Sequence, residues 1–236
     1  MPTVLITGAN RGLGLEFARQ YAADDSDVLA TTRNPDASRE LEALAKKFPK
    51  LRLLRLDVAD ERSIQDLARQ VGGKPIDLLI LNAGLYPRDG QRIGELDYPG
   101  WRQAFETNVL GPVRVAETLL ANVEESKRKQ IAALSSSMSS LRAVQGASVE
   151  QSGTAYQYRT SKTALNMTMS ILAKELEPRG ISVVLLDPGW VQTDMGGGRA
   201  PLTPEQSIRG MRRVLARNPK SLAGKFLVHD GSEREW

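Results

Sequence analysis

TGANRGLG, residues 7–14, is a glycine-rich turn that follows a short apolar run beginning at Val4 and precedes a segment of helical spacing beginning near Leu15. Glycine permits a tight turn and lets the backbone approach a phosphate group, and the positive end of a following helix attracts negative charge. A glycine turn in this position, between a first strand and a first helix, indicates a dinucleotide-binding site. The residues after the last glycine do not include the Lys-Ser or Lys-Thr pair of a nucleotide-triphosphate P-loop.

Short runs rich in branched aliphatic residues recur along the chain, and segments with helical spacing separate them. The apolar runs cover residues 4–7, 28–32, 51–56, 76–81, 131–135, 181–186 and 225–229. The segments with helical spacing cover residues 15–23, 62–71, 101–123, 158–176 and 204–216. Runs that are apolar at nearly every position are typical of strands buried on both faces. The alternation predicts an α/β protein with a single domain over residues 1–236: a doubly wound parallel sheet (Rossmann fold) of seven strands flanked by helices on both faces.

Three stretches interrupt this alternation: residues 85–100, 137–157 and 194–204. All three follow strands, and in an open α/β sheet the loops that leave the carboxyl ends of the strands form the ligand crevice. We therefore expect them to be pocket walls, although ordinary surface loops are an equal alternative. Apolar side chains in or near these stretches either line a pocket or belong to the core: Tyr86, Leu141, Trp190 and Met195.

Composition and charge exclude several classes of chemistry. The 236 residues include 32 basic and 28 acidic side chains spread along the chain, a net charge of +4 that is typical of a mixed solvated surface and does not favour nucleic acid as a partner. The chain has no cysteine, which excludes disulfides, thiolate catalysis and sulfur-ligated metal. The single histidine, His229, disfavours a histidine metal cluster or a Ser-His-Asp triad. We expect no metal.

The first residues, MPTVLITG, show neither a basic leader nor a cleavage site. The apolar runs are all far shorter than the ~18 residues that span a membrane. We therefore expect a cytoplasmic protein without a membrane partner.

The end of the second predicted strand reads Thr-Thr-Arg-Asn at residues 31–34. An acidic residue in this position holds the ribose 2′-hydroxyl of NAD, whereas arginine accommodates the 2′-phosphate of NADP. Arg33, together with Arg11 inside the glycine turn, would clamp that phosphate through charge-assisted hydrogen bonds. Two solvated arginines are the alternative interpretation. The residues favour NADPH/NADP over NAD.

YRTSK, residues 158–162, places a tyrosine and a lysine on one face of a predicted helix. Reduction of a carbonyl group needs a hydride from a cofactor and a proton for the oxygen. The Tyr158 phenol can supply that proton, but its reference pKa of about 10 must fall by about 3 units, or roughly 4 kcal/mol, to suit neutral pH. The Lys162 ammonium would act in that direction. The pair by itself is a weak signal, because such spacings arise by chance.

The ordered set of motifs resembles the short-chain dehydrogenase/reductase family. The set comprises TGANRGLG, LNAG at 81–84, the helical Asn108, the serine-rich strand end at 135–137, YRTSK, and DPGWVQTDM at 187–195. The match runs from Thr3 to beyond Met195. Within the family, the chain is most similar to the Sniffer-like carbonyl reductases and the bacterial C-factor group, through YRTSKTALNM, PGWVQTDMGG and a DG pair followed by Trp236.

The resemblance implies a role for each matching catalytic residue. It makes Tyr158 the acid/base and Lys162 its partner and ribose anchor, and Ser136 the hydroxyl that holds the substrate oxygen, with Ser135 as the fallback. Ser137 remains a third possibility, because the stretch between the serines and Tyr158 is longer than in many family members. Asn108 matches an asparagine that kinks a helix and holds water in a proton relay through Lys162. A mid-helix asparagine is otherwise mildly unfavourable.

The resemblance also implies a set of cofactor contacts. Asp57 and Val58 match the adenine contact, Asn82, Ala83 and Gly84 the backbone lining of the cleft, and Pro188, Gly189, Val191 and Thr193 the segment that fixes the nicotinamide carboxamide. The remaining expected contacts are Gly8, Asn10, Arg11, Gly12, Leu13, Gly14, Arg33, Tyr158 and Lys162. In isolation, Asp57 would be interpreted as a helix cap and Pro188-Gly189 as a plain turn.

The family implies NADPH-dependent reduction of a small-molecule aldehyde, ketone or quinone, and a homodimer formed by the helices at 101–123 and 158–176. Two alternatives stay open. One is a dinucleotide-binding signalling or sensing protein that keeps the fold but acts through a partner. The other is dehydrogenation of an alcohol as the working direction. The intact set of Ser136, Tyr158, Lys162 and Asn108 favours catalysis, because a pure binding module does not need a tuned phenol.

Overall fold

A parallel sheet forms the centre of the computed structural model, which describes residues 1–88, 90, 92–145 and 154–236. Within the described residues the sheet has seven strands in the order β3-β2-β1-β4-β5-β6-β7. Their bounds are β1 Thr3–Ile6, β2 Asp27–Thr32, β3 Leu51–Arg55, β4 Leu78–Leu81, β5 Gln130–Leu134, β6 Ser182–Asp187 and β7 Phe226–Val228. All are parallel to their neighbours. The predicted fold class is confirmed.

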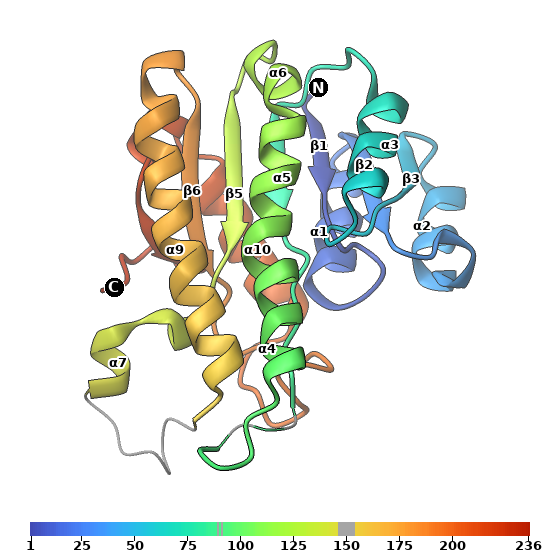
Figure 1. Cartoon of the computed structure of the whole chain (residues 1–236). Helices are drawn as coiled ribbons and strands as arrows, with labels where there is room; N and C mark the ends of the chain where they lie inside the picture. The colour runs from blue at the N-terminus through green and yellow to red at the C-terminus, as the bar shows by residue number, and fades with distance from the viewer. Residues whose placement is uncertain (89, 91, 146–153) are drawn as a thin grey trace.

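Helices cover both faces of the sheet (Figure 1). One apolar layer packs α3, α5 and α9 against one face, and a second layer packs α1, α2 and α10 against the other. The helices are α1 Gly12–Ala23, α2 Arg39–Lys47, α3 Glu61–Val71, α4 Tyr98–Phe105, α5 Gly111–Thr118, α6 Leu120–Glu124, α7 Leu141–Gln145, α9 Tyr156–Leu176 and α10 Pro204–Leu215. Short 3-10 turns are η1 Pro35–Ala37, η3 Ser137–Ser139, η4 Glu177–Arg179 and η5 Pro219–Ser221.

The strand order reverses between β1 and β4. From β1 the chain proceeds outward through β2 and β3, and it then returns to the other side of β1 to form β4 through β7. In open α/β sheets, ligands bind outside the carboxyl ends of the strands at such a switch point. The glycine turn follows β1 and residues 82–84 follow β4, so both predicted segments lie at this point.

The predicted helix over residues 101–123 is present, but it is not a regular α-helix throughout. The structure divides this region into α4, a π-helical segment η2 Glu106–Leu110, α5 and α6. Pro112 has no N–H to donate to the carbonyl four residues earlier, at Asn108, so the regular helical ladder is interrupted there. The wider π turn places Asn108 at its centre.

The structure also differs from the prediction in several element boundaries and in one additional helix. The first helix begins at Gly12 rather than near Leu15, so the last glycines of the turn belong to its first turn. The expected loop at 137–157 contains η3, α7 and the start of α9, and residues 146–153 lie outside the described residues. The expected loop at 85–100 ends where α4 begins. The amphipathic helix α2 had not been predicted. None of the described helices is long and apolar enough to cross a membrane.

Candidate active site

Packing within the glycine turn requires glycine at two of the predicted positions. Gly8 has φ +67, and a Cβ built there would lie 3.0 Å from the Cα of Ala83. A Cβ at Gly14 would lie 2.2 Å from the carbonyl oxygen of Gly8, which is far too close. The backbone of the turn therefore approaches its neighbours more closely than any side chain would allow.

The turn is tied to the residues that follow β4. The Thr7 hydroxyl accepts hydrogen bonds from the backbone N–H groups of Asn82 and Ala83, both at 2.9 Å. The Asn82 side-chain amide donates to the carbonyl oxygens of Thr7 and Gly8, at 2.8 and 3.0 Å. Segments more than seventy residues apart in the chain thus form one rigid unit at the switch point.

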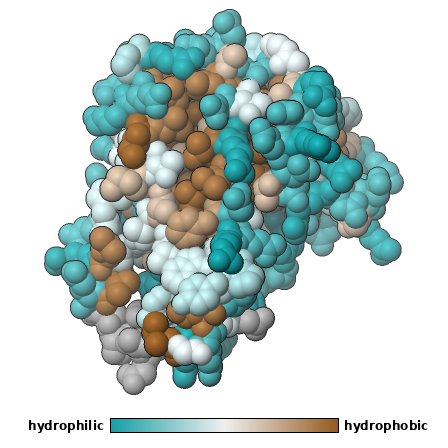
Figure 2. Space-filling view, viewed as in Figure 1, coloured by the Kyte–Doolittle hydropathy of each residue, from teal (hydrophilic) through white to brown (hydrophobic). Residues whose placement is uncertain are grey.

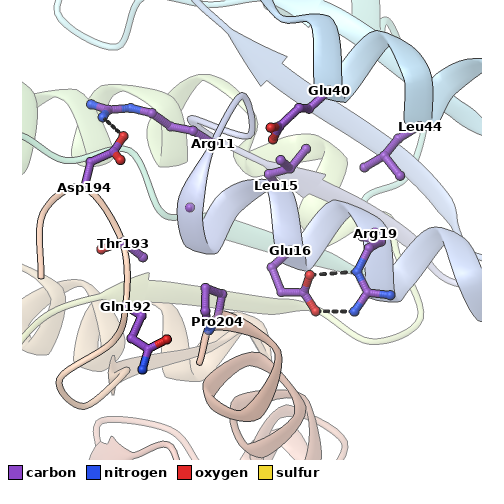
Figure 3. Close-up of a pocket in the computed structure, with 11 residues that line it drawn as sticks. Arg11, Leu15, Glu16, Arg19, Glu40, Leu44, Gln192, Thr193, Asp194 and Pro204 are labelled. Atoms are coloured by element: carbon purple, nitrogen blue, oxygen red, sulfur yellow. Dashed lines mark hydrogen bonds and ion pairs between the residues drawn. The ribbon is translucent and has the colours of Figure 1, made fainter. Parts of the chain in front are cut away.

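An open cavity of about 500 Å³ lies beside this turn (Figure 3). Its lining residues come from the glycine turn, α1, α2, the loop after β6 and the first residue of α10: Arg11, Gly12, Leu15, Glu16, Arg19, Glu40, Leu44, Gln192, Thr193, Asp194 and Pro204. A Cβ built at Gly12 would lie 3.5 Å from Cγ2 of Thr193, so the turn and the loop meet here. In the described part of the chain, no side chain caps the N-terminus of α1 and no acidic residue stands in its first turn. Its amide groups therefore remain available to an anionic ligand.

Arg11 forms an exposed ion pair with Asp194 across one end of this cavity, at 2.6 Å (Figure 3). Its neighbours in the turn are the exposed Asn10 and the half-buried Leu13. Arg33 lies exposed directly after β2. Because the backbone N–H of Ala9 donates to the Thr31 carbonyl at 2.7 Å, the turn is fixed two residues before Arg33. A phosphate contact by these two arginines stays a prediction.

Asp57 and Val58 have structural partners. The Asp57 carboxylate accepts a hydrogen bond from the backbone N–H of Ala59 at 3.0 Å, and so stabilises the turn after β3. Val58 packs against α5, since a Cβ built at Gly111 would lie 3.0 Å from the Cβ of Val58. Their expected adenine contacts stay a prediction.

Tyr158 and Lys162 lie one helical turn apart near the start of α9, and both are buried. The Lys162 Nζ donates to the carbonyl oxygen of Leu134 at the end of β5, at 2.7 Å. The same Nζ lies 5.8 Å from the centre of the Tyr158 ring. Helix α9 thus delivers both groups to the carboxyl end of the sheet.

Asn108 is fully buried at the centre of the π segment. Its Oδ1 accepts from the backbone N–H of Leu85 at 2.7 Å, and its Nδ2 donates to the Leu85 carbonyl at 2.8 Å and to the Ser161 hydroxyl at 2.9 Å. A Cβ built at Gly84 would lie 3.5 Å from the Asn108 Oδ1 and 3.6 Å from the Lys162 Nζ. Gly84 therefore lies next to both atoms.

The two candidate serines differ in their surroundings. The buried Ser135 hydroxyl donates to Oδ1 of Asn166 at 2.5 Å, and the Asn166 side-chain amide donates in turn to the Ser139 hydroxyl at 2.8 Å. Ser136 is only half-buried; its hydroxyl accepts from the backbone N–H of Met138 at 3.2 Å and is hydrogen-bonded to the Tyr158 side chain. The interior holds the Ser135 hydroxyl, and the Ser136 hydroxyl faces the phenol.

Burial controls the protonation of the central pair. It raises the pKa of the Tyr158 phenol well above its ordinary value, and the hydrogen bond from Ser136 opposes this while the charge of Asp187 adds to it. Burial lowers the pKa of the Lys162 ammonium to about 8. The expected lowering of the phenol pKa is therefore not produced by the chain alone, because a dry site disfavours the charged form of both groups.

The segment after β6 forms a second glycine-dependent turn. Gly189 has φ +76, its N–H donates to the Asp187 carboxylate at 3.0 Å, and a Cβ there would lie 2.8 Å from the His229 and Leu202 side chains. The Pro188 carbonyl accepts from the Ser207 hydroxyl at 2.7 Å. Val191 is buried and pairs with Leu202, which leads the chain to Thr193 at the cavity.

Of the expected pocket-wall residues, Tyr86 lies closest to the central pair: its ring centre is 4.7 Å from that of Tyr158. Leu141, Trp190 and Met195 are exposed. Among the described residues there is no cluster of three or more His, Cys, Asp or Glu side chains that would hold a metal ion.

Sequence reasoning missed Asp187 and Arg234, which form an ion pair beside the site. The signal for Asp187 was a carboxylate ending an otherwise apolar strand. Nothing in the local sequence marks Arg234.

Several known proteins resemble this chain in sequence and fold. Residues 2–201 match the family model for short chain dehydrogenase. The C-signal protein of Myxococcus xanthus is 41% identical over 165 residues, which cover 69% of this chain and 93% of that protein. The structure of NADPH-bound carbonyl reductase from chicken fatty liver has a TM-score of 0.91 and 31% identity, and covers 100% of this chain and 99% of that chain. Carbonyl reductase Sniffer of Drosophila melanogaster has a TM-score of 0.90 and 29% identity, with both chains covered at 100%.

These likenesses confirm the resemblance that the motifs predicted, both to the family and to its Sniffer-like and C-factor members. The family model spans most of the chain, and the relatives align over most of their own length. The chain belongs to the short-chain dehydrogenase/reductase family.

Proposed function

We propose that this protein is an NADPH-dependent carbonyl reductase that reduces an aldehyde, ketone or quinone, with Tyr158 as the proton donor. The observation that carries the proposal is the convergence of Ser136, Tyr158, Lys162 and Asn108 at the carboxyl end of the sheet, at the switch point that also bears the glycine turn. Four polar groups buried or half-buried together at a ligand crevice are typical of a catalytic site.

The cofactor is NADPH/NADP. The close-packed glycine turn and the uncapped N-terminus of α1 suit a pyrophosphate, and the strand end at Arg33 offers a cation and no carboxylate to the ribose. The similar chicken liver enzyme binds NADPH. When bound, the cofactor supplies the hydride that the carbonyl carbon receives.

The residues of this chain then handle the proton. Burial keeps the Tyr158 phenol protonated, which is the form that donates a proton to the carbonyl oxygen. Ser136, beside the phenol, is placed to hold that oxygen by a hydrogen bond. The Lys162 ammonium stabilises the phenolate that the transfer leaves behind. Asn108 and Lys162 both lie next to Gly84, and we propose that they form part of the path by which a proton returns to the site.

The test follows absorbance at the nicotinamide band while NADPH is mixed with a panel of aldehydes, ketones and quinones. We expect substrate-dependent oxidation by the wild type and its loss in Tyr158→Phe, with cofactor affinity retained. Turnover that survives in Tyr158→Phe would reject the phenol as proton donor. No turnover in the wild type across the panel would reject the reductase itself.

A matched pair of variants tests the choice of serine. Ser136→Ala should lose at least tenfold in turnover and keep its stability, because its hydroxyl faces the phenol. Ser135→Ala should instead lose about 1–2 kcal/mol of stability, because it leaves the buried Asn166 carbonyl without a donor. Urea unfolding and turnover of both variants give the answer; a reversed pattern makes Ser135 the substrate contact.

A second candidate is a dinucleotide-binding signalling or sensing protein. The likeness to the C-signal protein favours it, at 41% identity over 165 residues. The same assay separates the reductase from the sensing protein. If the wild type and Tyr158→Phe both bind the cofactor and neither turns over any substrate, the result supports the sensing role.

We further propose that the chain forms a homodimer and works in the cytoplasm. Figure 2 shows apolar side chains gathered on the face that carries α9 and α5. Met167 and Ile171, one turn apart on α9, are 65% and 59% exposed, and Leu110 before α5 is 41% exposed. A contiguous apolar face on packed helices is typical of an interface, and a second copy of this chain offers the matching face.

A further inference from the structure

The segment after β7 folds back along that strand. The backbone N–H of Val228 donates to the Ser232 carbonyl and that of Arg234 donates to the Phe226 carbonyl, both at 2.8 Å. The Trp236 ring packs on Phe226, with ring centres 5.5 Å apart. This hairpin carries Arg234 back toward the carboxyl end of β6.

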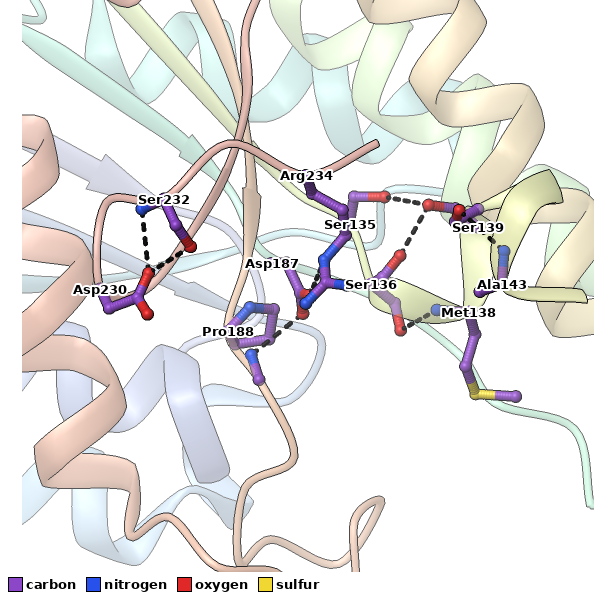
Figure 4. A network of polar contacts seen from close by, with 12 residues as sticks. Ser135, Ser136, Met138, Ser139, Ala143, Asp187, Pro188, Asp230, Ser232 and Arg234 are labelled. Atoms are coloured by element: carbon purple, nitrogen blue, oxygen red, sulfur yellow. Dashed lines mark hydrogen bonds and ion pairs between the residues drawn. The ribbon is translucent and has the colours of Figure 1, made fainter. Parts of the chain in front are cut away.

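Arg234 forms an ion pair there with a carboxylate that is 1% exposed: its Nε lies 2.6 Å from Oδ2 of Asp187 (Figure 4). The contact is one of charge rather than a well-directed hydrogen bond. The second carboxylate oxygen accepts from the N–H of Gly189 at 3.0 Å. A buried carboxylate needs such partners, because removal of a charge from water is costly.

The ion pair borders the reaction centre. Asp187 is the last residue of β6, and the neighbouring strand continues into Ser135, whose N–H donates to the Leu186 carbonyl at 2.7 Å. Ser136 follows directly, and Figure 4 shows it with Asp187 and Arg234. The Asp187 charge acts on the Tyr158 phenol and raises its pKa.

Several polar and charged groups surround the Tyr158 phenol, from four parts of the fold. The groups are Lys162 from α9, Tyr86 from the segment after β4, Ser136 from the end of β5, and Asp187 from the end of β6. Asp187 is the anion among these groups. The cation that pairs with Asp187 is Arg234, which comes from the hairpin after β7.

We propose that Arg234 is a positioning residue of the active site, whose guanidinium neutralises the buried Asp187 carboxylate so that the phenolate formed at Tyr158 does not face an uncompensated negative charge. The inference rests on the proposed function, in which Tyr158 exchanges a proton with the substrate. It adds a residue from the far end of the chain to the machinery that sets the acidity of the phenol.

The sign of the effect follows from electrostatics. Without Arg234, the Asp187 charge disfavours the phenolate and raises the phenol pKa in the active complex. Without the Asp187 charge, Arg234 favours the phenolate and lowers that pKa. Removal of both charges should cancel the two effects. Alcohol oxidation needs the phenolate as base, so the pH at which its rate rises reports the phenol pKa directly.

The experiment measures kcat/KM for NADP-dependent oxidation of the alcohol product across pH, in the wild type, Arg234→Gln, Asp187→Asn and the double variant. We expect the rising limb to move up by about one pH unit in Arg234→Gln and down by about one unit in Asp187→Asn. The double variant should return to within a few tenths of a unit of the wild type. Arg234→Lys, which keeps the charge, should restore most of the wild-type profile.

Arg142→Gln is the matched control. It breaks the exposed ion pair between Arg142 and Glu235, 2.9 Å long, which joins α7 to the same hairpin. Its profile should coincide with that of the wild type, because both charges are solvated. Urea unfolding of every variant shows whether stability changes separately from the profile.

The outcomes separate the two proposals. A wild type that turns over, a Tyr158→Phe variant that does not, and charge variants whose profiles all coincide would reject the role of Arg234 while leaving the reductase intact. A wild type without turnover in either direction removes both proposals. If Arg234→Gln does not fold, the double variant is compared with Asp187→Asn. A rising limb that lies at higher pH in the double variant supports the proposal, because only the Arg234 charge differs between the two, and coincident profiles overturn it.

Discussion

The Lys162 ammonium is buried, and burial of its charge lowers the stability of the folded protein. Burial lowers the pKa of its ammonium from 10.5 to about 8. A fall of about 2.5 units corresponds to about 3 kcal/mol of differential stabilisation between the two protonation states. Its hydrogen bond to the Leu134 carbonyl returns only part of this. The residue is retained at the expense of stability, as expected of a functional group.

Lys162→Met should therefore stabilise the fold and abolish turnover. Below about pH 8 the lysine is charged in both the folded and unfolded states, and the variant should gain about 2 kcal/mol after the loss of the Leu134 hydrogen bond. Because the folded-state pKa is the lower one, wild-type stability rises with pH between about 8 and 10.5, so the advantage of the variant should shrink over that range. Urea unfolding at pH 7 and pH 10 measures this; an advantage independent of pH contradicts it.

Arg33 is the residue on which cofactor preference should depend. Arg33→Asp replaces a cation at the end of β2 with a carboxylate that repels a 2′-phosphate and accepts hydrogen bonds from a ribose 2′-hydroxyl. We expect the ratio of kcat/KM for NADPH to that for NADH to fall by at least tenfold. Arg39→Asp, the same charge change at an exposed position at the start of α2, is the control. If the ratio of kcat/KM for NADPH to that for NADH falls equally in both variants, the effect comes from the net charge of the protein and not from a contact of Arg33.

At the scale of elements, the π segment η2 connects a backbone irregularity to the site. An ordinary helix through residues 101–123 would have presented a different side chain to the loop after β4. The π segment instead turns Asn108 toward the backbone of Leu85 and the hydroxyl of Ser161, and thereby fixes that loop to α9. Irregular helices of this kind are frequent at functional sites.

Asn108→Ala should lose about 2–3 kcal/mol of stability, because it leaves buried groups of Leu85 without partners. Turnover per folded molecule should also fall at least tenfold. The control is Asn122→Ala, which removes amide hydrogen bonds to the carbonyls of Gly72 and Lys74 away from the site. Both variants should unfold at lower urea concentrations than the wild type, but only Asn108→Ala should lose turnover. Equal turnover in the two would limit Asn108 to a structural role.

At the scale of the whole molecule, the two helical layers differ in what they expose. The layer of α3, α5 and α9 exposes Met167 and Ile171 on α9, and Leu110 is exposed directly before α5. Figure 2 shows apolar side chains gathered on this face. A group of exposed apolar side chains on one helical face favours assembly of two copies of the chain.

Ile171→Glu should convert the proposed dimer into a monomer, since a charge at the centre of an apolar interface loses its water without gaining a partner. Sedimentation at micromolar concentration should show about 52 kDa for the wild type and the single-chain mass of 25.9 kDa for the variant. Arg213→Glu on α10, in the opposite layer, is the control and should stay dimeric. A wild type that sediments as a monomer rejects the homodimer.

The order of the elements was predictable because it depends on local and periodic properties. Buried parallel strands need apolar side chains at nearly every position, and this pattern located the seven strands that the described residues form. The glycine turn could be predicted from the sequence because its tight packing requires glycine: a Cβ at Gly8 or Gly14 would clash with its neighbours. Tyr158 and Lys162 were readable as a pair because an i, i+4 spacing on a helix places them one above the other. The extent of the domain, 1–236, and the roles of the site residues stay predictions.

Contacts between distant segments could not be predicted from the sequence, because they depend on the register of the sheet and the path of the loops. Ser135 and Ser136 are adjacent residues of the same type, so the sequence does not distinguish their roles. In the structure the Ser135 hydroxyl is hydrogen-bonded to the buried Asn166 side chain. Asp187 and Arg234 are 47 residues apart, and the hairpin after β7 makes them an ion pair. The pKa values of Tyr158 and Lys162 likewise follow from burial. Local periodicity and turn chemistry are encoded by near neighbours in the chain, whereas burial and charge pairing exist only once distant segments have packed together.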